Sequence, residues 1–357
     1  MRMIDRMALF ALYALDPETA HHTALFALEN GLVGARTGPN DPILATTVWG
    51  LGFSNPIGLA AGFDKDARVV DAMLKLGFGF VEAGTVTPKP QPGNPKPRLF
   101  RLMDDFAVIN RLGFNSGGVE AFAERLKKRR ANAHAPGIVG ANVGKNRDTV
   151  DGAADYVVGI AAVAGLADYL VVNISSPNTP GLRALQARAP IEDLLNRAMA
   201  ARNRAVPGTK KPPLLAKVGP DLSEDQLHDI AEVALATKVD GLIIGNTTID
   251  RPASLKSRDK AQAGGLSGAP LMAPSTACLS AVYRLTKGKI PLIGCGGVAS
   301  GADAYAKIRA GASLVQVYSA LVFEGPDLAE RVKRELAQCL RADGFARVSD
   351  AVGQDHR

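Results

Sequence analysis

The sequence is poor in several kinds of residue, and each shortage excludes a class of protein. Only 3 of the 357 residues are cysteines, at positions 278, 295 and 339, and they form no paired motif. We therefore expect reduced thiols in a cytoplasmic compartment rather than a disulfide framework. No apolar run approaches the roughly 18 residues of a membrane-spanning helix. The start of the chain resembles neither a signal peptide nor a transit sequence.

Aromatic residues make up only 5% of the chain, and they do not interleave with its basic residues. The net charge is +7, carried mainly by residues 124–147, 183–217 and 251–260. Nucleic-acid binding is therefore disfavoured, and solvated helix faces or an anionic ligand explain the charge better. No cluster of histidines and carboxylates has the spacing of metal ligands, so we predict no metal site. A hydrophobic content of 46% with 22% charged residues is typical of a soluble globular protein.

Residues 1–45 differ from the rest of the chain. Apolar residues recur at helical spacing from Ile4 to Leu15 and again from Ala20 to Leu32, with Asp16-Pro17-Glu18 between them. The pattern predicts a helical hairpin with more apolar surface than one helix–helix contact would bury. It either packs on the main domain or faces a membrane surface or an apolar ligand. With three arginines, no lysine and five acids, any attachment to a membrane would be mainly hydrophobic.

The remainder is a sustained alternation of apolar runs and helical patterns. After a short hairpin at Thr46–Phe53, eight apolar runs are each followed by an amphipathic stretch: 57–61, 79–83, 138–143, 169–174, 213–218, 241–245, 291–294 and 314–318. Eight such units predict an α/β fold, a (β/α)8 TIM barrel over residues 46–341 with a small N-terminal helical hairpin domain. A doubly wound open sheet is the alternative, but no early Gly-x-Gly-x-x-Gly supports it. We expect the polar tail, residues 342–357, to be loosely held.

Polar residues follow every apolar run, where a barrel has its mouth. The first run ends in Ala61-Gly62-Phe63-Asp64-Lys65, and amides, hydroxyls and Lys217 follow later runs. Each of these polar segments could by itself be a turn or a solvated side chain. Polar segments after all eight runs, however, favour a site for a large anionic ligand. Gly296-Gly297 and Tyr318-Ser319 follow the seventh and eighth runs, the usual place for a phosphate bound by backbone N–H groups.

The most informative strand end is residues 173–181, where two prolines stiffen a polar loop. Ser176 has no His–Asp pair to activate it, so acyl transfer is not supported. A phosphate-bearing cofactor with a positioned hydroxyl suits hydride or proton abstraction better. Serine is a weak base, and it would need a dry pocket and a neighbouring hydroxyl such as Thr179. The alternative is that Ser176 is only a capping hydroxyl.

Five motifs together resemble those of the dihydroorotate dehydrogenases. They are Ala60–Lys65, Asn110–Asn115, Asn173–Arg183, Gly264–Gly268 and Gly294–Val298, and the likeness runs from the helical hairpin to about Leu340. The resemblance implies an FMN-containing barrel that oxidises dihydroorotate to orotate in pyrimidine (UMP) biosynthesis. In this family the catalytic base is serine in the membrane-associated, quinone-reducing class (class 2) and cysteine in the soluble class. Ser176 and the helical hairpin both point to class 2.

The resemblance also implies roles for individual residues. FMN would be bound by Ala61, Gly62, Lys65, Thr85, Asn142, Asn173, Lys217, Gly245, Gly268, Gly297, Tyr318 and Ser319. The substrate would contact Lys65, Asn110, Arg111, Leu112, Gly113, Phe114, Asn173, Asn178, Asn246 and Thr247. Ser176 would take the C5 proton while flavin N5 takes hydride from C6, with Phe114 and Thr179 shaping the proton exit. Lys217 would place positive charge near the N1/O2 edge of the flavin.

The leader and spanning helix of mitochondrial members have no counterpart here. We therefore expect a bacterial protein, peripheral on the cytoplasmic side of the cell membrane, monomeric, and reducing ubiquinone or menaquinone. The quinone entrance would be lined by faces around residues 7–15 and 24–32. Cys295, where the family commonly has a small apolar residue, is expected to be a buried thiol. Two alternatives are a soluble dihydroorotate dehydrogenase using fumarate or NAD, and a non-catalytic anion-binding barrel whose hairpin docks a protein.

Overall fold

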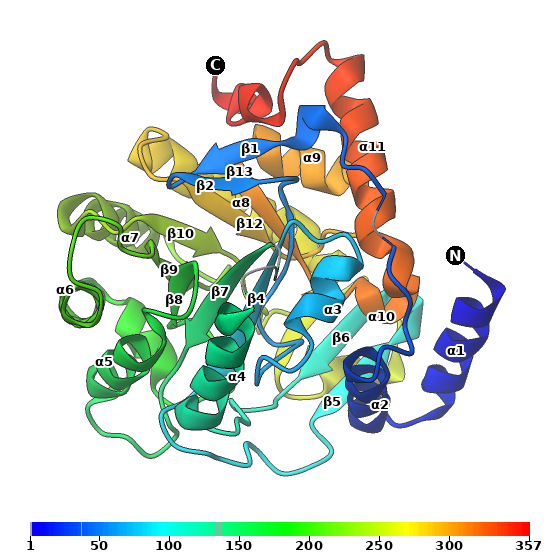
Figure 1. The fold of residues 1–357 in the computed structure, drawn as a ribbon, viewed down its shortest axis with the longest axis horizontal. Coiled ribbons are helices and arrows are strands. Elements are labelled where there is room, and N and C mark those ends of the chain that lie inside the picture. Colours follow the sequence, from blue (N-terminus) through cyan, green and yellow to red (C-terminus); the bar gives the residue numbers. More distant parts are fainter. Residues whose placement is uncertain (1, 37, 133–134, 136) are drawn as a thin grey trace.

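A closed parallel barrel forms the centre of the molecule (Figure 1). The computed structural model describes residues 2–36, 38–132, 135 and 137–357. The barrel strands are β3 (Ile57–Leu59), β4 (Phe80–Val86), β7 (Ile138–Val143), β8 (Tyr169–Asn173), β9 (Leu214–Val218), β10 (Gly241–Ile244), β12 (Leu292–Cys295) and β13 (Ala312–Val317). Each of the eight predicted apolar runs therefore forms one strand of the barrel, and the predicted fold class is confirmed.

Helices surround the barrel and bury their apolar stripes against it. They are α3 (Val70–Lys75), α4 (Val119–Ala131), α5 (Gly152–Val163), α6 (Arg188–Ala205), α7 (Glu224–Thr237), α8 (Met272–Thr286), α9 (Gly301–Arg309), the short α10 (Leu321–Glu324) and α11 (Leu328–Ala342). The α7 helix begins with a capping box, in which Ser223 and Gln226 satisfy each other's backbone N–H groups. The core between strands and helices is continuous around the barrel.

The barrel interior changes from apolar to polar along the strands. Because side chains alternate between faces, inward-pointing residues are two positions apart. The lower layer is one apolar cluster that includes Phe80, Tyr169, Leu215, Ile293 and Leu314. Two residues further along four of these strands come Glu82, Lys217, Cys295 and Gln316. The sequence therefore fills the bottom of the barrel with apolar side chains and leaves polar groups for the mouth.

A two-stranded hairpin closes the bottom of the barrel. Strands β1 (Thr46–Val48) and β2 (Leu51–Phe53) pair antiparallel, as predicted, and bring Val48 and Phe53 into the lower cluster. Two glycines make room for the aromatic rings of that cluster. A Cβ atom at Gly58 would lie 2.2 Å from the Phe80 ring, and one at Gly140 would lie 2.1 Å from the Tyr169 ring.

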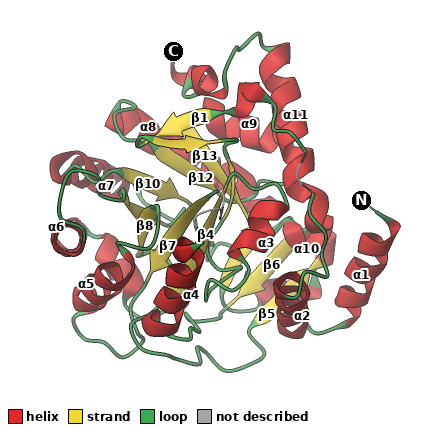
Figure 2. Cartoon of the chain, viewed as in Figure 1, coloured by secondary structure: helices red, strands yellow, loops and turns green. Residues whose placement is uncertain are grey.

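A second sheet, which we call the roof sheet, is formed by two excursions from the barrel (Figure 2). Its strands are β5 (Leu99–Leu102), β6 (Ala107–Asn110) and β11 (Gly265–Gly268), with β6 in the middle and both pairings antiparallel. Its own apolar core contains Leu102, Ile109 and Leu266. The sequence patterns did not predict this sheet.

The helical hairpin consists of α1 (Met3–Ala14) and α2 (Pro17–Glu29), as predicted. The Asp16 carboxylate caps α2 by accepting from the N–H groups of Glu18 and Thr19. Helix α1 lies at the edge of the molecule beside α2 (Figure 1), and none of its residues is fully buried. Among the described residues, no helix combines the length and apolarity needed to cross a bilayer.

The buried carboxylate of Glu18 fastens the hairpin to the barrel domain. It accepts hydrogen bonds from Arg98 Nε at 3.1 Å and Nη2 at 2.7 Å, and both side chains are 8% exposed. The same guanidinium donates to the carbonyl of Asn94, whose amide nitrogen donates to the carbonyl of Asn178. The hairpin is thus connected to the predicted substrate loop through two side chains.

The C-terminal tail is packed, so the expectation that it is loosely held is wrong. Val348 and Ala351 are buried, and the N–H of Gly353 donates to the carbonyl of Ile308. The His356 ring stacks on Tyr283 at a centroid distance of 5.1 Å. A few apolar side chains in a polar segment were enough to bind it to α8 and α9.

Candidate active site

A cavity of about 510 Å³ lies at the carboxyl ends of the barrel strands, beneath the roof sheet. Most of the predicted site residues line it: Ala61, Gly62, Lys65, Thr85, Asn110, Leu112, Gly113, Phe114, Asn173, Ser176, Asn178, Lys217, Asn246, Thr247, Gly268, Gly297, Tyr318 and Ser319. Residues up to 258 positions apart therefore converge on one space. The roof sheet adds Val108 and Ser267, which the sequence patterns did not indicate.

Four predicted residues do not line the cavity, and one of them is Thr179, whose hydroxyl is buried in the loop after β8. The side chain of Arg111 donates to Gln262 and to the Ala263 carbonyl, and its guanidinium lies 4.7 Å from the centre of the Phe100 ring. Gly245 packs against strand β12, where a Cβ atom would come within 2.0 Å of the Cys295 carbonyl oxygen. The fully buried Asn142 lies behind the cavity wall and contacts it through Thr85.

A chain of hydrogen bonds runs from the barrel interior to the cavity, and we call it the Glu82 relay. The Glu82 carboxylate accepts from Asn142 Nδ2 at 2.7 Å, and Asn142 Oδ1 accepts from Thr85 Oγ1 at 2.6 Å. Thr85 Oγ1 then accepts from Asn173 Nδ2 at 2.8 Å. A carboxylate only accepts, so each later group has its donor turned toward Glu82. Asn173 consequently presents its oxygen on the far side, where Asn246 Nδ2 lies at 3.4 Å.

Two further residues complete the surroundings of Glu82. Gln316 Nε2 donates to it at 2.6 Å, and the Tyr169 hydroxyl donates at 3.2 Å. Burial and the adjacent carboxyl raise the pKa of Tyr169, which keeps its hydroxyl a donor. Sequence patterns did not single out Glu82 or Gln316, since a charged residue inside a buried strand has no distinctive spacing.

The loop after β8 holds Ser176 in a buried position, 7% exposed, on the cavity wall. Ser176 Oγ accepts from the N–H of Asn178 at 3.3 Å, and Asn178 Nδ2 donates to Asn110 Oδ1 at 3.1 Å. Arg183 binds the start of the loop by donating to the Ser175 carbonyl, and it pairs with Asp221 at 2.9 Å. The hydroxyl of Ser176 is therefore held in a buried part of the wall by a loop that several hydrogen bonds fix.

Buried polar atoms without partners concentrate in this region. Among the described residues, only Thr179 Oγ1, Thr247 Oγ1 and Gln316 Oε1 are buried side-chain oxygens or nitrogens that lack a hydrogen-bond partner. Leaving such an atom unpaired costs about 1–3 kcal/mol. Thr247 and Gln316 line the cavity. The cavity is therefore suited to a ligand that supplies their missing hydrogen bonds.

Two lysines give the cavity positive charge near Ser176 and the amides. Lys217 is 4% exposed, and Lys65 donates to Asn115 Oδ1. Desolvation, assisted by the charge of Arg98, lowers the pKa of Lys65 to about 7. Such a lysine gains its charge fully when an anion binds beside it.

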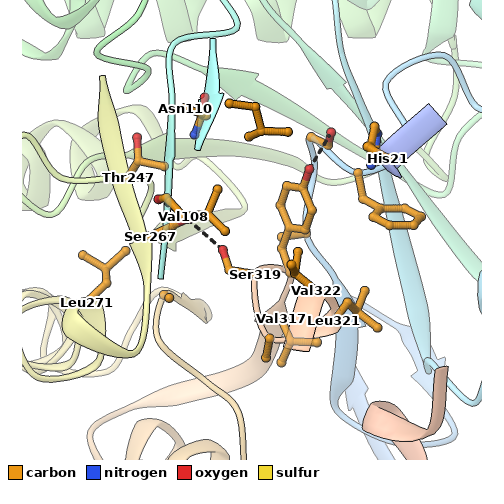
Figure 3. Close-up of a pocket in the computed structure, with 18 of the residues that line it drawn as sticks. His21, Val108, Asn110, Thr247, Ser267, Leu271, Val317, Ser319, Leu321 and Val322 are labelled. Atoms are coloured by element: carbon orange, nitrogen blue, oxygen red, sulfur yellow. Dashed lines mark hydrogen bonds between the residues drawn. The ribbon is translucent and has the colours of Figure 1, made fainter. Parts of the chain in front are cut away.

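Glycines and hydroxyls form another part of the wall, with no charged side chain. Ser319 Oγ donates to Ser267 Oγ at 2.7 Å, and Leu271 lies beyond this pair (Figure 3). Gly297 packs on the first residue of α8, where a Cβ atom would come within 2.3 Å of the Met272 backbone. Backbone N–H groups at such a helix start favour a phosphate.

On the other side the cavity continues between the two helices of the hairpin. His21 marks this side in Figure 3, away from Leu271. The hairpin contributes Leu9, Leu12, Tyr13, Pro17, Ala20, His21 and Ala24 to the lining. Residues of the first predicted face, 7–15, line the cavity. Of the second predicted face, 24–32, only Ala24 does, and the other lining residues of α2 come from its beginning. Two further residues line this part of the cavity although the sequence analysis did not predict them. They are His21 of α2 and Arg101 of the roof-sheet strand β5.

His21 is a neutral polar group within this apolar passage. Burial, reinforced by the charge of Lys65, lowers the pKa of His21 to about 4. Its ring meets Phe63 edge-on at a centroid distance of 5.2 Å. The passage thus offers apolar walls with a few uncharged donors, as well as the Arg101 guanidinium.

Cys295 lines the cavity and is partly exposed to it, so its thiol is less buried than expected. Burial nevertheless raises the pKa of Cys295 and keeps the thiol protonated at neutral pH. In the part of the chain that the structure describes, no three His, Cys, Asp or Glu side chains are grouped to hold a metal ion.

Known proteins resemble this chain over nearly its whole length. A family model described as dihydroorotate dehydrogenase matches residues 43–340. The chain is 62% identical to dihydroorotate dehydrogenase (quinone) of Azorhizobium caulinodans, over 96% of each chain. It is 51% identical to the mitochondrial dihydroorotate dehydrogenase (quinone) of Mus musculus, over 96% of this chain and 88% of that one. A crystal structure of DHODH from Eimeria tenella with ferulenol matches with a TM-score of 0.93 and 44% identity, covering 97% of this chain and 99% of that one.

Proposed function

This chain belongs to the dihydroorotate dehydrogenase family, in its quinone-dependent class, and on that premise we propose how its residues divide the reaction. It is an oxidoreductase that oxidises dihydroorotate to orotate in pyrimidine biosynthesis and passes the electrons to a quinone. Membership also implies a flavin, which we propose is FMN. The main support for these residue assignments is that one cavity is lined both by Ser176 and by the helical hairpin.

The cavity wall fits a flavin with a phosphate group. The unpaired oxygen of Gln316 calls for a hydrogen-bond donor. The wall around Gly297 and Ser319 presents backbone groups to a phosphate. The residues that would hold FMN are Ala61, Gly62, Lys65, Thr85, Asn142, Asn173, Lys217, Gly245, Gly268, Gly297, Tyr318 and Ser319. Asn142 would act through Thr85, and Gly245 by allowing close packing of β10 on β12.

When bound, the flavin supplies the acceptor for the hydride that leaves C6 of dihydroorotate. The protein's own contribution is positioning, charge and exclusion of water. Lys217, which lines the cavity, would hold a positive charge beside the flavin and so favour its acceptance of the hydride. The apolar lower layer and the roof sheet exclude water from the reacting groups.

The substrate is a carboxylate with amide-like edges, and the amides around Ser176 match it. Asn110 and Asn178 are already joined to each other, and Asn173 and Asn246 are joined at the end of the Glu82 relay. Thr247 has a free buried hydroxyl, and Lys65 supplies the charge for the carboxylate. Leu112, Gly113 and Phe114 would form the apolar side of the pocket. Arg111 would contribute only through its backbone, because its side chain lies on Phe100.

Ser176 would remove the C5 proton as a general base. Its hydroxyl lies on the wall of the pocket, and the nearby Thr179 hydroxyl is buried without a partner. As Ser176 takes the C5 proton it must release its own hydroxyl proton. The Thr179 hydroxyl, or a water that it holds, would accept that proton and pass its own on toward solvent. Phe114, 7% exposed, would limit the water that reaches this path.

The helical hairpin would deliver the quinone from a membrane. Its inner face lines the cavity, whereas Met3, Ile4, Met7 and Phe10 on the outer side of α1 are 66–78% exposed. Four exposed large apolar residues on one helix suit insertion into a lipid interface. We therefore propose a peripheral monomer on the cytoplasmic side of a bacterial membrane, with residues 1–45 as quinone entrance and residues 46–341 as FMN barrel.

The absorbance spectrum of the purified protein tests these assignments together. Oxidised flavin absorption should bleach on addition of dihydroorotate and return on addition of a soluble quinone analogue. Reoxidation by fumarate or NAD at the same rate would contradict the assigned acceptor. A colourless protein that takes up no FMN on reconstitution would contradict the cofactor.

A further inference from the structure

Lys307 of α9 is a fully buried cation that the proposed reaction does not use. Its side chain is 0% exposed, and its ammonium donates to Ser275 Oγ at 2.8 Å and to Thr276 Oγ1 at 2.9 Å. Both acceptors are neutral hydroxyls, and no ion pair joins Lys307 to a carboxylate in the described ranges. Asp303 on the same helix is an opposite charge that acts on Lys307 without forming an ion pair. A buried charge with no paired opposite charge is costly, so its presence requires an explanation.

The ammonium lies directly behind the Gly296–Gly297 loop of the cavity wall. Ser275 Oγ, which accepts from Lys307, is 3.0 Å from the carbonyl oxygen of Gly296 and 2.6 Å from that of Leu271. The aliphatic stem of Lys307 is equally close to the preceding strand, since a Cβ atom at Gly294 would lie 3.0 Å from its Cδ. One hydroxyl therefore separates the charge from the loop.

This part of the wall has no charged side chain of its own. The lining residues from β11, the short 3-10 turn Ala269–Leu271 before α8 and the Gly296–Gly297 loop are glycines, alanine, leucine and serine. The cavity's lysine and arginine residues, Lys65, Arg101 and Lys217, come from other segments. A phosphate monoester carries about −1.5 to −2 charges at neutral pH. Backbone N–H groups and the start of α8 supply only partial charges against it.

We propose that Lys307 is a positioning residue for the FMN phosphate, holding the Gly296–Gly297 loop through Ser275 and placing a full positive charge behind it. The inference rests on the proposed FMN site and adds a residue that does not touch the ligand. It also explains the missing carboxylate, because the cofactor itself supplies the opposite charge. Burial lowers the pKa of Lys307 to about 8, and a bound phosphate would raise it again.

Comparison of two flavins tests the proposal. FMN and riboflavin share the ring system and the ribityl chain, and only FMN has the phosphate. Apoprotein stripped of flavin is titrated with each, and quenching of flavin fluorescence gives the two dissociation constants. Lys307→Met should weaken FMN binding by roughly 10–100-fold and leave riboflavin binding within about twofold. Lys307→Arg should keep most of the selectivity for FMN.

A second buried lysine provides the matched control. Lys333 on α11 is 4% exposed and pairs with Glu330, outside the cavity lining. Lys333→Met should leave the ratio of the two dissociation constants unchanged, whatever it does to stability. Ser275→Ala gives a second route if Lys307→Met fails to fold, because it cuts the link to Gly296, and it should also weaken FMN selectively.

Equal losses for both flavins in Lys307→Met and Ser275→Ala would mean that these residues only support the fold, which overturns the proposal. Unchanged FMN binding would overturn it as well. Wild-type apoprotein that binds neither flavin would instead contradict the cofactor assignment on which the proposal rests.

Discussion

Glu82 and Asn142 face each other inside the barrel, and the carboxylate fixes the direction of the asparagine amide through a hydrogen bond of 2.7 Å. That direction is transmitted through Thr85 to Asn173 at the substrate pocket. The Glu82 carboxylate at the start of the relay therefore determines that Asn173 presents its side-chain oxygen, and not its nitrogen, to the pocket. An amide in place of the Glu82 carboxylate can both donate and accept, so it no longer fixes the orientation of the Asn142 side chain.

We predict that Glu82→Gln weakens orotate binding and slows reduction of the flavin, each by about 10-fold, since a disturbed buried hydrogen bond costs about 1–3 kcal/mol. Orotate titration and stopped-flow bleaching measure the two effects. Tyr169→Phe is the control, because it removes a donor to Glu82 that lies outside the relay. It should lower the melting temperature and leave orotate affinity unchanged. Equal orotate affinities in the wild type, Glu82→Gln and Tyr169→Phe would show that Glu82 does not orient the substrate pocket.

Ser176→Ala should retain the flavin but slow its reduction by dihydroorotate about 10²–10⁴-fold, the usual contribution of a general base. Single-turnover bleaching measures this rate directly. Ser175→Ala is the neighbouring control: Ser175 Oγ accepts from Asn246 Nδ2 at 2.9 Å and does not line the cavity. Its loss should raise the dissociation constant for orotate more than it lowers the bleaching rate. Normal bleaching in Ser176→Ala would assign the proton to another group.

Orotate affinity should fall with pH above about 7, because Lys65 has a pKa of about 7 in the free protein. Below that pH the ammonium is already formed, and affinity should be constant. Above it the binding anion raises the pKa of Lys65 and draws a proton from solution, so affinity should drop up to about 10-fold per pH unit. Calorimetry in buffers of different ionisation enthalpy would count the proton taken up. Binding without proton uptake at pH 8 would contradict the assignment.

Docking of the hairpin should weaken at acid pH. The hydrogen bond from Arg98 lowers the pKa of Glu18 below the ordinary glutamic acid value. A lowered carboxyl pKa stabilises the folded form at pH values above the unfolded pKa, and that contribution disappears as pH falls through the lower, folded value. The hairpin should therefore stay docked at neutral pH and loosen below the ordinary glutamic acid range.

The corresponding variant, Glu18→Gln, leaves Arg98 buried without its partner and should cost about 3–5 kcal/mol at neutral pH. Hydrogen exchange of α2 amides would report this locally. Glu29→Gln removes the more exposed pair with Arg68 and should cost at most about 1 kcal/mol. Similar exchange in both variants would mean that the buried pair does not fasten the hairpin.

Membrane attachment should depend on the outer side of α1. The double variant Met7→Ser, Phe10→Ser removes two residues that are 66% and 77% exposed, and it should lower liposome binding by about 10-fold or more. Val150→Ser alters an even more exposed apolar residue, in the loop before α5, and should have no effect. Flavin reduction by dihydroorotate should be normal in both. Undiminished sedimentation of the double variant with liposomes would exclude this face.

The barrel could be predicted from sequence because each strand and helix has its own local period. The roof sheet could not, because its strands have four residues each and β6 pairs with β11 across more than 150 positions. Nothing local in Gly265-Leu266-Ser267-Gly268 favours a strand, so only the tertiary pairing makes it one.

The site residues could likewise be predicted where local sequence indicated them and not where distant contacts decide their position. Residues at strand ends converged because parallel strands end at one mouth. Glu82, Gln316 and Lys307 were missed because a polar residue in a buried strand or helix looks the same whether it is solvated or enclosed. The side chain of Arg111 turned away because the Phe100 ring, on a strand that was not predicted, lies beside it.

The pairing of β6 with β11 also sets an order of events during synthesis. Strand β6 ends at residue 110, but its partner is complete only at residue 268. Until then the ribosome-bound fragment has an unpaired β6 edge above a barrel that lacks β12 and β13. A nascent chain shorter than this should bind chaperones at that edge, and neither half of the barrel alone should assemble a substrate pocket.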